Sequence, residues 1–160
     1  MEVFLRQIQP NDNPYIATII RKSLEEFGAN KLGTVYYDAS TDALYQLFQT
    51  QRSVYFIATY NDEIIGGAGI FPTDGLPHNT AELVKMYIKP AFRGKGIGKK
   101  LLDQCTSWAK VNGYENVYLE TMPELKKAIS TYEAYGFKRL QNPLGNSGHT
   151  GCDIWMQKEL

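Results

Sequence analysis

The fold is decided by the stretch Ala81-Glu82-Leu83-Val84-Lys85-Met86-Tyr87-Ile88-Lys89-Pro90, followed two residues later by Arg93-Gly94-Lys95-Gly96-Ile97-Gly98. The first part has the composition of a strand that a proline ends. The glycines then lead into a segment whose apolar residues recur at helical spacing until Asn112-Gly113. Val117-Tyr118-Leu119 is the next strand. A strand, a helix and a strand in succession predict a parallel pair of strands.

The segments outside this unit favour antiparallel strands and further helices. The predicted fold is therefore α/β (α+β), with one mixed, mostly antiparallel, twisted sheet of about seven strands and about four flanking helices. We expect strands at 3–8, 54–60, 64–71, 81–88, 117–119, 137–140 and 153–157, and helices at 13–27, 41–48, 97–111 and 123–135. The glycines of 64–71 indicate a bulge or a close approach to the backbone.

Length and composition limit the classes of function. The 160 residues, 43% of them apolar, predict one domain over residues 1–160. Seventeen basic residues balance seventeen acidic ones, which argues against a nucleic-acid partner bound through bulk positive charge. We find no apolar run of about 18 residues and no signal-peptide pattern, so we expect a cytoplasmic protein without a membrane partner.

The cysteines and histidines do not suggest a metal site. Cys105 and Cys152 form no CxxC pair, and His78 and His149 have no nearby ligand at metal spacing. We therefore expect no metal. Cys105 falls on the apolar face of its helix, which makes it a poor candidate for a nucleophile.

The glycine loop predicts an anion site. Glycines at every second position free one side of the turn, so that backbone N–H groups and the helix N-terminus can face a phosphate. Arg93 and Lys95 can add charge-assisted hydrogen bonds. A tight turn without a ligand has the same glycine spacing. A P-loop is disfavoured because Lys99-Lys100 stand where a hydroxyl would be needed, and Gly-x-Gly-x-Gly departs from the dinucleotide fingerprint Gly-x-Gly-x-x-Gly.

Two motifs carry a resemblance to a known family. Arg93 to Gly98 resembles the Arg/Gln-x-x-Gly-x-Gly acyl-CoA loop of the GCN5-related N-acetyltransferases (GNAT family). Residues 81–90 resemble that family's fourth strand. Downstream, Ala128-Ile129-Ser130-Thr131-Tyr132-Glu133-Ala134-Tyr135-Gly136-Phe137 is similar to its Ala-x-x-x-Tyr-Glu-x-x-Gly-Phe signature. The resemblance implies an N-acetyltransferase that moves an acetyl group from acetyl-CoA to a primary amine by direct attack in a ternary complex.

The resemblance also assigns residues to the cofactor and to catalysis. The backbone of Arg93, Gly94, Lys95, Gly96, Ile97 and Gly98 would hold the pyrophosphate of CoA, and the backbone of Met86, Tyr87 and Ile88 would pair with its pantetheine arm. Tyr132 would protonate the departing thiolate, although its spacing alone is also that of a core residue. One departure is Leu125, at a position where the family often has a cofactor-binding asparagine.

The base and the acceptor stay open. Glu82 matches a position where several family members carry a catalytic glutamate, but a solvated carboxylate at a strand end fits the sequence as well. His78 or a water molecule are alternatives. The acceptor, a small-molecule or peptide amine, would be contacted by loops that contain Tyr36, Tyr37, Asp38, Asp74, His78 and His149.

Two rival functions and the oligomeric state are also undecided. A non-catalytic acyl-CoA-binding regulatory module would share the loop, and a dinucleotide-binding domain is a weaker alternative. The aromatic content is compatible with a homodimer.

Overall fold

The computed structural model describes residues 1–160 and contains one seven-stranded sheet in the order β1-β2-β3-β4-β5-β7-β6. Only β4 and β5 are parallel, and every other neighbouring pair is antiparallel. The strands are β1 (Phe4–Gln7), β2 (Val54–Tyr60), β3 (Glu63–Phe71), β4 (Thr80–Ile88), β5 (Asn116–Thr121), β6 (Lys138–Leu140) and β7 (Ile154–Glu159). The predicted mixed sheet, with its parallel pair around the glycine loop, is confirmed.

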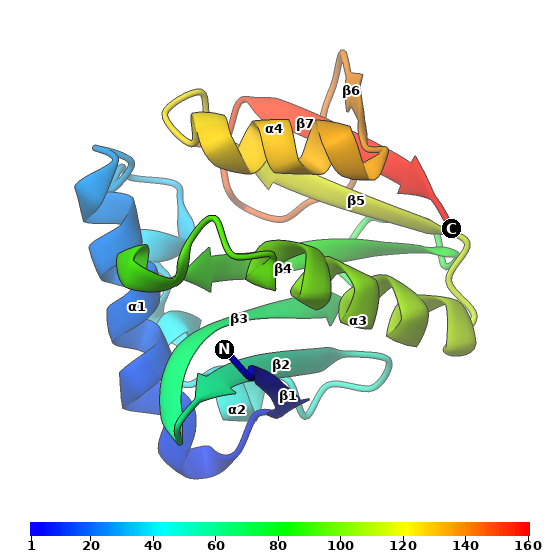
Figure 1. The fold of residues 1–160 in the computed structure, drawn as a ribbon. Helices are drawn as coiled ribbons and strands as arrows, with labels where there is room; N and C mark the ends of the chain where they lie inside the picture. Colours follow the sequence, from blue (N-terminus) through cyan, green and yellow to red (C-terminus); the bar gives the residue numbers. More distant parts are fainter.

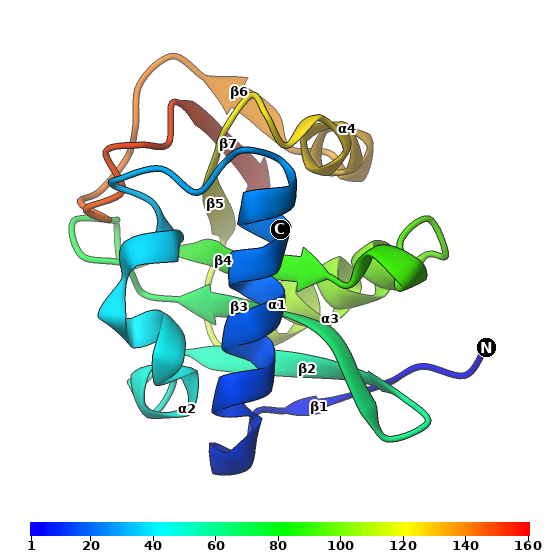
Figure 2. The same cartoon turned by 90° about the vertical axis from the view of Figure 1, so that its left-hand side faces the viewer.

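Four helices cover the two faces of the sheet. They are α1 (Asn13–Glu26), α2 (Leu44–Leu47), α3 (Ile97–Val111) and α4 (Lys126–Tyr135). Figure 1 shows α3 and α4 in front of the sheet, and the rotated view of Figure 2 shows α2 on the opposite side. Two buried apolar clusters match this layering: one joins α3 and α4 to the sheet, and the other joins α1 and α2 to it. No helix has the length and apolar character that crossing a membrane requires.

Two helices are shorter than predicted. The segment expected as the second helix begins with a 3-10 turn, Ala39–Asp42, and only Leu44–Leu47 is α-helical. Here the Thr41 hydroxyl bonds the carbonyl oxygen of Val35 at 2.7 Å, which ties the turn back to the preceding segment. Helix α4 begins at Lys126 because Leu125 has a non-helical backbone (φ −90°, ψ 56°) and packs its side chain against the second cluster.

Two of the three glycines of β3, Gly67 and Gly69, are explained by aromatic rings, and the third, Gly66, lies against the backbone of β4. A Cβ on Gly67 would lie 2.5 Å from the Tyr55 ring, and one on Gly69 would lie 2.7 Å from that ring and 2.9 Å from Phe48. The predicted close approach is thus made by the protein's own side chains. The Tyr55 hydroxyl in turn donates a hydrogen bond of 2.7 Å to the carbonyl oxygen of Lys85, so the tyrosine also holds strand β4.

Strand β4 contains a one-residue bulge at Lys85. In the pairing with β3, Gly69 faces Val84 and Gly67 faces Tyr87, so β4 has one residue more than β3 over this interval. Lys85 takes a positive φ of 51°, which a side chain other than glycine rarely adopts. The side-chain alternation shifts at this point: Met86 packs on the α3 side, whereas Val84 and Tyr87 both belong to the cluster on the α1 side.

Strands β4 and β5 pair over only part of their length. Their register runs from Thr80 opposite Asn116 to Glu82 opposite Tyr118 and then stops, while β5 goes on to pair with β7 alone. In Figure 1 the two strands separate toward α1. The backbone of β4 after Glu82 therefore has a free edge in the middle of the sheet, which is where the candidate site lies.

Candidate active site

The free edge of β4 carries Met86, Tyr87 and Ile88, the residues whose backbone the sequence assigned to the cofactor. On one side these residues pair with β3, as Gly66 opposite Ile88 and Gly67 opposite Tyr87 show. On the other side no strand accompanies them. Their remaining peptide groups can bond an extended ligand in the manner of an added strand.

The loop that follows β4 leaves six consecutive N–H groups without a protein acceptor, from Gly94 to Lys99. Gly94 (φ +74°) and Gly96 (φ +81°) are left-handed, and a Cβ at either would meet no atom within 4 Å. Gly96 caps α3, so the positive end of the helix dipole faces the same space. Gly98 packs close to strand β4 instead, since a Cβ there would lie 3.3 Å from the end of the Met86 side chain. This loop has the properties of a phosphate cradle.

The side chain of Arg93 does not serve this cradle, in contrast to our expectation from the sequence. Its guanidinium bonds the Ile88 carbonyl oxygen at 2.9 Å, Glu26 at 2.7 Å and Ser23 at 3.3 Å, and it stacks over the Phe27 ring. Arg93 thus anchors the loop to α1. In this arrangement Lys95, which is exposed, is the basic side chain left for an anion.

Tyr132 lies in α4 on the α3 side of the sheet. Its ring packs edge-on against Phe137 at 5.8 Å, and the residue is 7% exposed. The hydroxyl of nearby Tyr135 bonds Asp103 and Thr106, but that of Tyr132 has no hydrogen-bond partner in the protein. Burial raises the pKa of Tyr132 to about 12, so the phenol is protonated at neutral pH. It can donate a proton to a thiolate.

Glu82 lies on the opposite face of β4 and is 3% exposed. It is the third residue of the strand, which rules out the solvated strand-end carboxylate that the sequence left open. The Thr73 hydroxyl donates to its Oε1 at 2.5 Å. Burial raises the pKa of Glu82 to about 7, with Glu120 adding to the rise and the Thr73 hydrogen bond, His149 and Lys85 opposing it. A carboxyl group with this pKa is suited to accept a proton near neutral pH.

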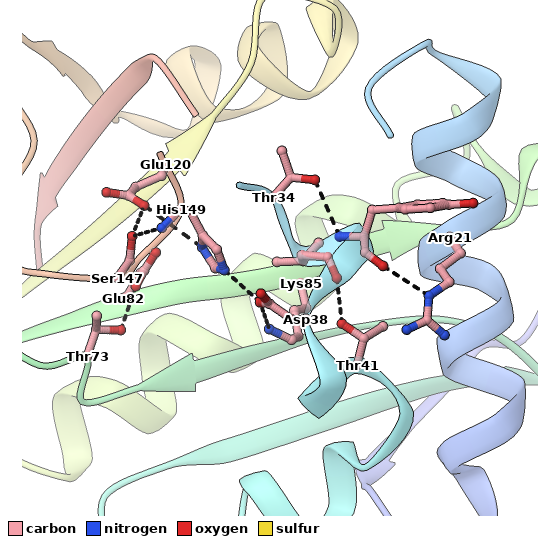
Figure 3. A network of polar contacts seen from close by, with 12 residues as sticks. Arg21, Thr34, Asp38, Thr41, Thr73, Glu82, Lys85, Glu120, Ser147 and His149 are labelled. Carbon is pink, nitrogen blue, oxygen red and sulfur yellow. Dashed lines mark hydrogen bonds and ion pairs between the residues drawn. The ribbon is translucent and has the colours of Figure 1, made fainter. Parts of the chain in front are cut away.

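His149 and Asp38, two of the polar loop residues singled out from the sequence, meet beside Glu82. His149 Nε2 lies 2.7 Å from Asp38 Oδ2, and its Nδ1 lies 4.0 Å from Glu120 Oε1. Burial works to raise the pKa of Asp38, but the hydrogen bond and charge of His149 and the charge of Lys85 outweigh it and lower that pKa. Figure 3 shows this network of contacts from Asp38 through His149 to Glu120.

Glu120 is fixed from two sides. The Tyr118 hydroxyl donates to its Oε2 at 2.6 Å and the Ser147 hydroxyl donates to its Oε1. A small cavity of about 40 Å³ opens between these groups. It is lined by Thr34, Val35, Glu82, Leu83, Val84, Lys85, Tyr87, Glu120, Met122, His149 and Cys152. Polar groups that converge on a concave space beside a free strand edge form a candidate acceptor pocket.

Other sequence candidates lie outside this pocket. His78, the alternative base, is exposed and lies against Arg52, with its Nδ1 3.3 Å from that guanidinium. The Tyr36 hydroxyl bonds Glu25, and neither Tyr37 nor Asp74 lines the cavity. Cys105 is buried, and burial raises its pKa above the ordinary value, so its thiol is inert.

Sequence reasoning missed Lys85, Glu120 and Ser147. Nothing local signals them: Lys85 is one lysine within a strand, and Glu120 follows a strand that was expected to end at Leu119.

A metal ion could find donor atoms in the pocket. One ligand atom each from Glu82, Glu120 and His149 lies within 4.8 Å of the others. Each of these side chains is also held by a protein hydrogen bond, to Thr73, Ser147 and Asp38 in turn. This use of the donors favours proton transfer over metal binding.

Comparisons with known proteins agree with this geometry. The model of the acetyltransferase (GNAT) family matches residues 17–137. The uncharacterized N-acetyltransferase YjgM of Escherichia coli is 40% identical over 158 residues, 98% of this chain and 94% of that protein. An acetyltransferase of the GNAT family from Staphylococcus aureus superposes with a TM-score of 0.87 at 18% identity, covering 99% of both chains. The PaiA N-acetyltransferase of Thermoplasma acidophilum, solved with coenzyme A, gives 0.78 at 20% identity over 100% of both chains.

Proposed function

The chain belongs to the GNAT family of acetyltransferases, and we propose that it transfers the acetyl group of acetyl-CoA to a primary amine by direct attack in a ternary complex. Residues 1–160 would act as one catalytic domain. The observation that carries the proposal is the free edge of β4. It has the phosphate cradle at one end, Tyr132 on one face, and Glu82 with its pocket on the other.

The donor would lie along the free edge of β4. Acetyl-CoA supplies an activated acetyl thioester when bound. The N–H groups from Gly94 to Lys99 would hold its pyrophosphate, and the peptide groups of Met86, Tyr87 and Ile88 would bond its pantetheine arm. A backbone N–H of this edge would also stabilise negative charge on the thioester oxygen during attack. The coenzyme A of the Thermoplasma relative supports this choice of donor.

Two side chains would handle the protons. Glu82, directly or through a water molecule, would take the proton that the amine nitrogen loses as it bonds the carbonyl carbon. When the carbon–sulfur bond then breaks, Tyr132 would protonate the thiolate. The products are an amide and CoA with its thiol restored. Cys105 is too deeply buried to form an acyl-enzyme, and burial raises the pKa of Cys152, the cysteine that lines the pocket, to about 12, so that its thiol stays protonated; both observations support direct transfer.

Binding is tested first because it does not require the acceptor. We expect acetyl-CoA and CoA to bind with micromolar affinity in a calorimetric titration and NADH not to bind. Gly96→Ala should weaken CoA binding, because a side chain strains its left-handed backbone. Gly28→Ala is the matched control, since Gly28 (φ +64°) also has open space around its Cβ position and lies outside the loop. The donor site would be contradicted if Gly96→Ala bound CoA as tightly as Gly28→Ala and the unmodified protein do. It would also be contradicted if the unmodified protein did not bind CoA.

Turnover then separates an enzyme from an acyl-CoA-binding regulatory module. Release of the CoA thiol is followed with a panel of primary amines, and the amide product is identified by mass spectrometry. The enzyme is supported if the unmodified protein acetylates an amine of the panel and the Glu82→Gln variant acetylates the same amine more slowly. Tight acetyl-CoA binding with no amide formed from any amine would favour the regulatory module.

A further inference from the structure

Lys85 is the feature of the pocket that amine acetylation does not explain. Its side chain is only 5% exposed, and its nearest carboxylate oxygen, Asp38 Oδ2, is 4.0 Å away. That distance is too long for a hydrogen bond, and the ammonium makes no hydrogen bond elsewhere in the protein. The Lys85 ammonium nevertheless retains some accessible surface. Among side-chain nitrogen and oxygen atoms without a hydrogen-bond partner, only Glu124 Oε2 is fully enclosed. Lys85 is also one of the residues that line the cavity, so its partly accessible ammonium lies at the site.

The neighbouring carboxylates are engaged with other groups. Asp38 bonds the imidazole of His149 at 2.7 Å. Glu82 accepts from Thr73, and Glu120 accepts from Tyr118 and Ser147. Figure 3 shows Lys85 next to Asp38, whose Oδ2 is also the atom that contacts His149. A buried ammonium whose hydrogen-bonding capacity is unused is suited to an anionic ligand.

The placement of Lys85 depends on the bulge. With regular alternation along β4, residue 85 would point to the same side as Leu83, into the apolar cluster under α3. The extra residue turns Lys85 to the side of Glu82, Val84 and Tyr87, where all four line the cavity. The positive φ at this lysine has a cost in backbone strain, so the position is one the fold actively maintains through Tyr55.

We propose that the acceptor is a small amino-carboxylate, such as a free amino acid, whose carboxylate pairs with Lys85 while its amine faces Glu82. The inference rests on the proposed acetyltransferase function. The same cavity offers the second carboxylate oxygen of Glu82, Oε2, which accepts no hydrogen bond in the protein, for the amine, and the Lys85 ammonium for an anion. A polyamine would leave the Lys85 ammonium facing a second cation, which disfavours it against an amino-carboxylate.

Matched acceptors test the proposal. Each amino acid is compared with its primary amide and with the amine that lacks the carboxyl group, under saturating acetyl-CoA. We expect kcat/KM of the unmodified protein to favour the amino acid by 10-fold or more over both. Lys85→Met, which keeps the length of the side chain and removes the charge, should lower kcat/KM for the amino acid by about 10- to 100-fold, the loss of one charged hydrogen bond. For the carboxyl-free amine the change should stay within threefold.

The controls separate this proposal from the proposed function. Lys89→Met removes a partly exposed lysine that pairs with Glu63 and lies outside the cavity, so the acceptor preference of this variant should equal that of the unmodified protein. If Lys85→Met does not fold, the preference of the unmodified protein among the matched acceptors is sufficient to test whether the acceptor is an amino-carboxylate. The amino-carboxylate is overturned if the unmodified protein acetylates the amine or the amide faster than the amino acid. It is also overturned if Lys85→Met lowers kcat/KM equally for all acceptors. Failure to bind acetyl-CoA would instead overturn the acetyltransferase itself.

Discussion

Replacing Glu82 by glutamine should remove a buried acid whose protonation is linked to folding. The pKa of Glu82 is raised by burial from 4.5 to about 7. The folded protein therefore holds this proton more tightly than the unfolded chain. The contribution of this bound proton to the free energy of unfolding is complete below pH 4.5 and is lost as the pH rises to about 7. A difference of about 2.5 pH units corresponds to about 3 kcal/mol at 1.36 kcal/mol per unit.

Glutamine cannot ionise, and its amide oxygen can still accept the Thr73 hydrogen bond. The free energy of unfolding of Glu82→Gln should therefore gain about 3 kcal/mol relative to the unmodified protein between pH 4.5 and pH 8. Urea unfolding at several pH values measures this difference. Glu159→Gln, a change at an exposed carboxylate outside the site, should show no such trend.

The same substitution should also act on catalysis. If Glu82 is the base, kcat/KM of the unmodified protein rises with pH through an apparent pKa near 7, and Glu82→Gln lowers it by about 10²-fold or more and removes that limb. A difference in unfolding free energy that stays constant from pH 4.5 to pH 8 would refute the raised pKa. An unchanged acidic limb in Glu82→Gln would exclude this carboxylate as the base and leave a water molecule or another pocket group.

Three further outcomes are expected. Tyr132→Phe should lower kcat by about 10²-fold with acetyl-CoA affinity unchanged in calorimetry, whereas Tyr135→Phe, which loses a partly exposed hydroxyl, should leave kcat within about threefold. Gly67→Ala should cost about 1–3 kcal/mol in urea unfolding, because its methyl group would meet the Tyr55 ring at 2.5 Å; an unchanged midpoint would contradict this packing. EDTA should leave turnover unchanged, because Glu82, Glu120 and His149 are already held by protein hydrogen bonds. A loss of turnover that a divalent cation restores would instead assign these three side chains to a metal.

The parts of the fold that could be predicted from the sequence are those encoded over short distances. The turn after β4 is one, because glycine spacing, a preceding strand and a following amphipathic helix all lie within some thirty residues. The parallel pair follows from the same unit. The end of α4 is another, since Gly136 takes a left-handed backbone (φ +111°) at the residue where the helix was expected to stop.

The acceptor pocket could be predicted only in part because it is assembled from distant segments. Asp38 precedes a 3-10 turn, Glu82 lies in β4, and His149 comes from the loop before β7. The sequence marked all three as polar residues in plausible regions, but it had no means to distinguish His149 from His78. Only the tertiary structure shows that His149 meets Asp38 while His78 lies exposed beside Arg52.

The bulge at Lys85 links the two halves of the proposed reaction. Pairing of β4 with β5 ends at Glu82, and the bulge follows three residues later, so one short segment of strand separates the donor edge from the acceptor pocket. A regular strand would direct Met86 toward the acceptor and bury the charge of Lys85 in an apolar core. The extra residue reverses both placements. Because the Tyr55 hydroxyl holds the bulge, and because Gly67 and Gly69 make room for the Tyr55 ring, these two glycines of β3 are a requirement of the site in β4.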